Sequence, residues 1–211
     1  MNKLMSIMSA IALVALAACN TGNENKPEEK SSNTHTAHTM HSNPPAGYAD
    51  SVNAGLIKED TLKGSPRRTA MNTIGGTHVH IEYNSPGVKG RIIWGGLVAW
   101  NKVWVAGAHN ATSIRFYKDV VVGGQTIKAG TYAVFAVPGK EKWTWVLNTN
   151  FDQHLTDEYD AKEDIIRIEA IPENHLFTER LTYTVEKTGE KSGAVSLLWD
   201  SLKIILPFKN L

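Results

Sequence analysis

The sequence predicts an all-β fold, an antiparallel β-sandwich of about nine to ten strands with one short helix. Residues 77–83 alternate strictly between polar and apolar side chains, as in a half-buried strand, and end at the turn-forming stretch Asn84-Ser85-Pro86-Gly87. Valine, isoleucine, threonine and aromatic residues dominate several further short runs, as a pleated surface prefers. No helix long enough for a crossover separates these runs, so neighbouring strands are expected to pair antiparallel.

The other expected strands are bounded by glycine, proline and asparagine turn signals, among them Gly123-Gly124 and Pro138-Gly139-Lys140. They cover residues 91–98, 103–106, 112–122, 126–137, 142–148, 165–171, 178–187 and 194–208, and the last run is long enough for two strands. Only residues 151–162 have a helical pattern, and that stretch is short. The globular domain is expected to span residues 67–211.

The chain begins with a pattern typical of bacterial export. Lys3 gives a positive start, residues 11–16 are apolar, and the run ends in Leu16-Ala17-Ala18-Cys19. Residues 1–18 are therefore expected to be a signal peptide, too short to be a membrane span. The ending resembles the bacterial lipobox, which implies that Cys19 becomes the lipidated N-terminus. An ordinary signal peptide with an incidental cysteine is the alternative.

Location and tether follow from the residues after Cys19. Asn20 is not the aspartate that retains lipoproteins at the inner membrane of enteric bacteria, so the resemblance implies the outer membrane, on its periplasmic or its surface face. Residues 19–66 are polar with few large apolar side chains, which predicts a flexible tether. The tether contains a tract whose side chains suit copper or zinc, made of His35, His38, Met40 and His41. The alternative is that these histidines are simply polar residues of a linker and bind no metal.

Charge and cysteine content exclude several classes of function. The 22 basic and 21 acidic side chains leave no basic stripe for nucleic acid. A single cysteine excludes an internal disulfide and a thiolate cluster. The Gly-x-Ser-x-Gly elbow, the phosphate-binding loop and the His-Glu-x-x-His helix motif do not occur, so no catalytic residue is assigned.

The sharpest chemical pattern is His78-Val79-His80-Ile81-Glu82. Side chains two residues apart in a strand share a face, which places His78, His80 and Glu82 together and turns Val79 and Ile81 to the core. Two imidazoles with a carboxylate as third ligand or orienting partner suit zinc or copper.

Two further histidines extend the predicted metal site. His109 follows an expected strand end, and His154 stands near Asp157 and Glu158. If they converge with the first pair, they complete a zinc or copper centre. The alternative is that all four histidines are ordinary surface or backbone-bonded residues, because spacing alone does not establish proximity.

Tryptophans offer a different interpretation. Trp143 and Trp145 share one strand face, and exposed aromatic rings on a sandwich can stack on sugars, as in glycan-binding modules. Such rings are more often part of the core.

Glycine and tryptophan motifs across residues 81–208 carry a resemblance to a known family. They are Ser85-Pro-Gly-Val-Lys-Gly-Arg91, Trp94-Gly-Gly-Leu97, Trp104-Val-Ala-Gly-Ala108, Ala129-Gly-Thr-Tyr132 with Pro138-Gly139, and Trp143-Thr144. Together they resemble domain of unknown function 2911. The resemblance implies a secreted, largely β domain typical of Bacteroidota, with no established activity. The chain departs from the family's commoner pattern at Val105 and His109.

Taken together, the sequence predicts a membrane-tethered lipoprotein with a non-catalytic, ligand-binding β-sandwich. A transition metal is the leading ligand, and zinc or copper the expected ion. A glycan-binding module and a structural or partner-binding envelope protein are the alternatives. The sequence does not identify protein partners.

Overall fold

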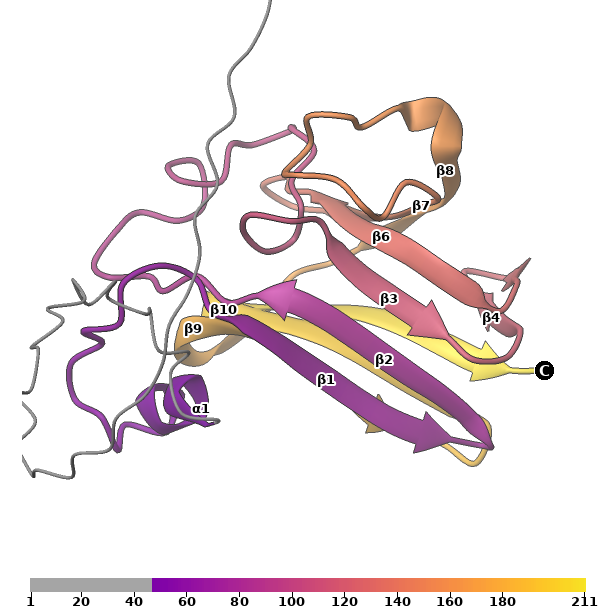
Figure 1. The fold of residues 1–211 in the computed structure, drawn as a ribbon, viewed down its shortest axis with the longest axis horizontal. Helices are drawn as coiled ribbons and strands as arrows, with labels where there is room; N and C mark the ends of the chain where they lie inside the picture. Colours follow the sequence, from indigo (N-terminus) through magenta and orange to yellow (C-terminus); the bar gives the residue numbers. More distant parts are fainter. Residues whose placement is uncertain (1–46) are drawn as a thin grey trace, which may run out of the picture. The chain divides into compact units, whose positions relative to one another are not determined.

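The structure is a computed structural model that describes residues 47–211 (Figure 1). The expected signal peptide over residues 1–18, Cys19 and the tail residues His35, His38, Met40 and His41 lie outside the described residues. The elements are α1 (Tyr48–Asn53), β1 (Arg67–Ile74), β2 (Thr77–Asn84), β3 (Thr112–Phe116), β4 (Val120–Val122), β5 (Gln125–Ile127), β6 (Gly130–Val137), β7 (Trp143–Asn148), a 3-10 helix (Ala161–Glu163), β8 (Asp164–Ala170), β9 (Glu173–Lys187) and β10 (Ser192–Asn210).

The strands form two antiparallel sheets that pack on each other, which confirms the predicted fold class. One sheet has six strands in the order β1-β2-β3-β6-β7-β8, and the other has four in the order β5-β4-β10-β9. In Figure 1 the long strands β9 and β10 run behind β1, β2 and β3. Within residues 47–211, no helix has the length and apolar character needed to cross a membrane.

The core lies between the sheets and follows the predicted alternation. In β2, Val79, Ile81 and Tyr83 are buried, while His78 and His80 are half-buried on the opposite face. Four tryptophans from different parts of the chain pack edge to face or stacked within this core, with ring centroids 4.7 to 6.4 Å apart: Trp94, Trp104, Trp143 and Trp199. The two faces of β2 therefore differ sharply in polarity.

Two expected strands are absent from the described structure. Residues 91–98 form turns, joined by a single bridge between Trp94 and Val98, and residues 103–106 contribute one bridge through Trp104. Glycines cause the first difference: Gly95 has a φ of 80°, and a Cβ on Gly96 would lie 2.3 Å from the carbonyl oxygen of Ile92. Residues 194–208, in contrast, lie in one strand, β10, with irregular pairing around Asp200.

The predicted helix over residues 151–162 is wrong, apart from the 3-10 turn at Ala161–Glu163. Side-chain hydrogen bonds organise this loop instead. Asn148 Nδ2 donates to the carbonyl oxygen of Asp160 and to Asp164 Oδ1, and the Asp160 carboxylate accepts from the backbone N–H of Lys162. Leu155 has a φ of 47°, which no α-helix accommodates.

The ordered domain begins before residue 67, so the expected end of the tether lies too late in the chain. Residues 47–66, called the N-terminal segment below, contain α1 and pack against β9. Arg180 of β9 is fully buried and forms an ion pair with Asp60, with Nε 2.6 Å from Oδ2. Its guanidinium also donates to the carbonyl oxygens of Leu62 and Gly64. These partners are far from Arg180 in sequence, which is why local composition did not indicate them.

Candidate functional site

The outer face of the six-stranded sheet carries rows of polar side chains. Directly paired strands place His80 of β2, Arg115 of β3 and Thr131 of β6 in one row. The next row holds Glu82 and Ser113. Cross-strand neighbours on one face have Cβ atoms about 5 Å apart, so these groups can act on one ligand.

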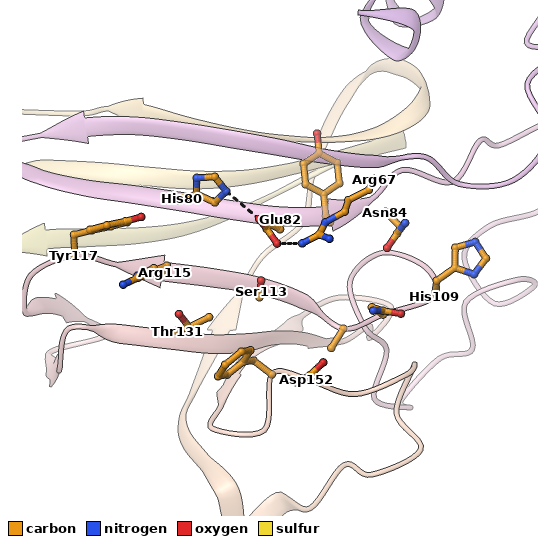
Figure 2. A pocket seen from close by; sticks show the side chains of 14 residues that line it. Arg67, His80, Glu82, Asn84, His109, Ser113, Arg115, Tyr117, Thr131 and Asp152 are labelled. Atoms are coloured by element: carbon orange, nitrogen blue, oxygen red, sulfur yellow. Dashed lines mark hydrogen bonds and ion pairs between the residues drawn. The ribbon is translucent and has the colours of Figure 1, made fainter. Parts of the chain in front are cut away.

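Loops cover the other part of this face and leave the polar rows open. Ala133, Phe135 and Val146 form a small second core with residues of the covering loops, in which the rings of Phe135 and Tyr159 meet edge to face at 5.1 Å. Beside it lies a pocket of about 730 Å³ (Figure 2). Its floor comes from β2, β3 and β6, and its rim from Arg67 and residues 109–111 and 151–152.

A chain of charged groups lies on the β2 side of the pocket. Arg67, at the start of β1, forms an ion pair with Glu82, and Glu82 Oε1 lies 3.5 Å from His80 Nε2. His80 Nε2 is buried and has no hydrogen-bond partner in the described structure. The carboxylate of Glu82 is thus neutralised by Arg67 and orients toward the imidazole.

Arg115 is positioned differently. Its guanidinium carbon lies 4.6 Å from the centre of the Tyr117 ring, a cation–π arrangement. Among the described residues, no carboxylate lies within ion-pair distance of Arg115. Ser113 and Thr131, both half-buried, bring hydroxyl groups to the same part of the floor.

The opposite rim carries an acidic and an apolar group next to each other. Asp152 and Phe151 belong to the loop after β7, and Phe151 is 44% exposed. Asp152 makes no ion pair with another residue of the described chain. Figure 2 shows Arg115 and Asp152 on separate segments, with Ser113 between them.

The predicted metal ligands are only partly brought together. His80 and Glu82 meet, and the ring of His78 lies 6.3 Å from that of His80, with its Nδ1 3.0 Å from Thr73 Oγ1. His109 lines the pocket rim, beyond Asn84 in Figure 2. Across residues 47–211, no three histidine, cysteine or acidic side chains form a group that could hold one ion.

His109 and His154 are neighbours through the backbone. The carbonyl oxygen of His109 accepts from the N–H of Leu155 at 2.7 Å, and Asn110 forms a bridge with His154. The imidazole of His154 pairs instead with Asp157, its Nδ1 2.9 Å from Oδ2, and does not line the pocket. The backbone contacts of His109 and Asn110 with residues 154–155 join the two loops that form the pocket rim.

Trp143 and Trp145 are not available to a sugar. Each is 1% exposed, with its ring on the core face of β7. Trp143 and Trp145 are two residues apart because both point into the core, and buried rings cannot stack on a sugar. Trp145 Nε1 donates to the carbonyl oxygen of Ile205 in the opposite sheet, which uses its only polar atom.

Several pocket residues were missed by sequence reasoning. Ser113 and Arg115 could have been placed on a polar face, since residues 112–116 alternate like β2. Arg67 and Asp152 gave no signal, because only strand register and loop conformation bring them to the pocket. Chemically, the arrangement can hold an anionic group at Arg115, a cationic group at Asp152 and hydrogen-bonding groups along the floor.

Comparison with known proteins bears on the family alone. Residues 65–208 match the family model described as protein of unknown function (DUF2911). No similar protein is found among curated proteins, and none among solved structures. The match covers more than half of the chain and nearly all of the sandwich, and so the chain belongs to the DUF2911 family.

Proposed function

We propose that this protein is a lipid-anchored binding protein of the cell envelope, whose sandwich binds a small polar molecule on the outer face of the six-stranded sheet. The observation that carries the proposal is the pocket of about 730 Å³. Its size lies in the range typical of small-molecule sites, and its lining combines charged, hydroxyl and aromatic groups from several segments.

Burial supports a role in binding. The polar rows stand beside a loop-covered part of the same face, where Phe135 and Val146 are fully buried. The covering loops stop at Ala111 and Phe151, which form the pocket wall. Solubility alone does not require a wall beside the polar rows. A ligand that lies against the wall, in contrast, makes contacts with the protein from which water is excluded.

A pocket-filling variant tests the proposal. Ser113→Trp places an indole on the pocket floor, and Thr126→Trp, on exposed strand β5 outside the pocket, is the matched control. Thermal unfolding of the chain from residue 20 onward is followed with a panel of sugars, carboxylates, amino acids and divalent metals. We expect one class to raise the melting temperature of wild type and Thr126→Trp in a saturable way, but not that of Ser113→Trp. Saturable stabilisation that survives Ser113→Trp, or none with any class, contradicts the proposal.

Zinc or copper is the second candidate ligand, favoured by the unpartnered Nε2 of His80 beside Glu82. Two protein donors leave further coordination positions to water. Calorimetry compares two proteins in which His35, His38 and His41 are replaced by alanine. The first has no other change, and the second also carries His78→Ala and His80→Ala. A domain site requires saturable binding that the double variant abolishes and that weakens in acid, because a metal binds only the neutral imidazole. Equal titrations remove the metal from consideration.

Membrane anchoring is tested separately at Cys19. We expect the wild-type chain to partition into detergent and to carry acyl mass, because the lone cysteine follows Leu16-Ala17-Ala18. Cys19→Ser should yield a soluble product or an uncleaved precursor. Identical partitioning and intact mass for the two chains, without acyl groups, contradict the anchor.

A further inference from the structure

We propose that the end of the domain beside Gly47 rests on the lipid bilayer and inserts apolar side chains from three segments among the head groups. This inference rests on the proposed lipid anchor and adds a direct contact of the domain with the same membrane. It begins from the three most exposed large apolar side chains of the described residues: Leu176 is 84% exposed, and Leu56 and Ile92 are each 79% exposed. One exposed leucine needs no explanation, but several at one end of a domain mark an interaction surface.

Two of these segments meet around a hollow of about 550 Å³. Leu56 follows α1 and stands between Gly55 and Ile57, which line the hollow together with Phe177. Phe177 is 56% exposed and is the neighbour of Leu176 near the start of β9. The N-terminal segment and β9 therefore present their exposed apolar side chains next to each other.

The turn that carries Ile92 is fastened to the same part of β9. The N–H of Val88 donates to the carbonyl oxygen of Glu179 at 2.8 Å, and Glu179 also lines the hollow. Within the turn, the N–H of Leu97 donates to the carbonyl oxygen of Ile92, and Leu97 is half exposed. Figure 1 shows the N-terminal segment and this turn at the end of the domain away from the C-terminus. We call the following side chains the apolar end: Leu56, Ile92, Leu97, Leu176 and Phe177.

The path of the chain favours a bilayer as the partner of the apolar end. Gly47, the first described residue, begins the N-terminal segment that carries Leu56. Residues 20–46 separate Gly47 from Cys19, and a polypeptide of that length spans about 95 Å at most. An anchored Cys19 thus keeps the domain near the bilayer, with this end joined to the anchor. Such a link raises the local concentration of the surface, so a modest affinity is enough to hold the domain on it.

The form of the apolar end also suits lipid. In β9, Asn174 pairs with Leu202 and Thr178 with Asp200, so β9 has more residues than β10 between these pairs. Leu176 and Phe177 lie in this bulge and stand out from the ladder. Separate projecting side chains can enter the interface of a bilayer, whereas a stable protein interface requires one closely packed surface.

Charge contributes little at this end. Around the hollow, two lysines are accompanied by two exposed or half-buried carboxylates: Lys58, Lys89, Glu59 and Glu179. Asp60, the fifth charged residue there, pairs with Arg180. The hollow therefore has no excess of basic side chains for anionic lipid, and binding is expected to depend on apolar contact.

Vesicle binding of the chain from residue 20 onward tests the proposal, because this chain lacks Cys19 and cannot be acylated there. Sedimentation with millimolar phosphatidylcholine vesicles gives a partition coefficient. We expect Leu56→Ser combined with Leu176→Ser to lower it about fivefold or more, because each leucine gains from leaving water. The matched control Met71→Ser with Leu211→Ser changes two exposed side chains outside the apolar end and should not lower it. Adding phosphatidylglycerol to the vesicles should change wild-type binding less than about twofold.

A fluorescent label locates the contact. The chain from residue 20 onward has no cysteine, so Leu176→Cys and Leu211→Cys each carry a single label whose emission shifts to the blue in an apolar environment. We expect vesicles to shift the label at residue 176 and not the label at residue 211.

Three results overturn the proposal: no sedimentation of the wild-type chain with vesicles, equal binding of the double variant and its control, or equal shifts of the two labels. Dimerisation that Leu56→Ser with Leu176→Ser abolishes, without vesicle binding, would assign the apolar end to a second copy of the chain and also overturn it. None of these outcomes affects the anchor itself, which is tested by acyl mass at Cys19.

Discussion

Two of the arginine–carboxylate pairs in the domain lie in opposite surroundings. Arg180 and Asp60 join β9 to the N-terminal segment, and their side chains are 0% and 3% exposed. Arg67 and Glu82 stand at the pocket, 71% and 38% exposed. In the buried pair, both Nη atoms of Arg180 donate hydrogen bonds to protein groups, whereas the exposed pair borders an open space. Chemistry alone therefore does not tell which arginine is structural, since burial and the number of partners decide it.

The largest loss of stability is expected when the buried pair of Arg180 and Asp60 is broken. Asp60→Ala leaves the fully buried guanidinium of Arg180 without its counter-charge, and we expect a loss of about 3–5 kcal/mol in the free energy of unfolding. Urea unfolding measures it. The control Asp50→Ala removes the pair with Arg68, in which Asp50 is 60% exposed, and should cost about 1 kcal/mol or less. Equal losses for the two variants would abolish the distinction between buried and exposed pairs.

Acid should weaken the buried pair in a predictable direction. Burial by itself would raise the pKa of Asp60, but the hydrogen bond and charge interaction with Arg180, together with the charge of Lys89 and the hydrogen bond from Tyr48, outweigh burial and hold the pKa below the ordinary value of 3.8. A lowered pKa in the folded state contributes stability that is fully present above pH 3.8 and is lost as the pH falls below it. The stability advantage of wild type over Asp60→Asn should therefore shrink below about pH 3.8 in urea unfolding. An advantage that is constant from pH 6 to pH 3 would refute the coupling.

The smallest effect on stability is expected at the pocket. Glu82→Gln should change the free energy of unfolding by about 1 kcal/mol or less, because the pair with Arg67 is largely exposed. Its effect on binding should be larger, since the formal charge of the pocket rises by one and Arg67 loses its partner. We expect calorimetry to show tighter binding of a simple carboxylate such as acetate, by several-fold. A marked loss of stability would mean that Glu82 is part of the fold rather than of a site.

Sequence reasoning succeeded where a pattern was local. The alternation in β2 was enough to separate Val79 and Ile81 from His78 and His80, because a strand has only two faces. It failed where contacts were distant. Asp60 and Arg180 are 120 residues apart, and nothing in the polar composition of residues 47–66 indicates that they pack on the sandwich.

The pocket shows the same limit. His80 and Glu82 were expected to face one way, and they do, but the sequence did not indicate that Arg67 would pair with Glu82. Pairing β2 with β3 brings Arg115 beside His80, and a loop brings Asp152 to the rim. Sequence alone does not give strand order, register or loop path, so it could propose a face but not a cavity.

Asn53 gives the N-terminal segment a further consequence. Its side-chain amide accepts from the N–H of Arg180 and donates to the carbonyl oxygen of the same residue, at 2.7 and 2.9 Å. It thereby satisfies both backbone groups of Arg180 at a point where the pairing of β9 with β10 is irregular. The other side of β9 is covered there by residues 86–88, because the N–H of Leu181 donates to the carbonyl oxygen of Pro86 and the N–H of Val88 donates to that of Glu179. A polypeptide started at Arg67 would keep this cover but lose the amide of Asn53, and opening of β9 at its irregular pairing is the form its failure would take.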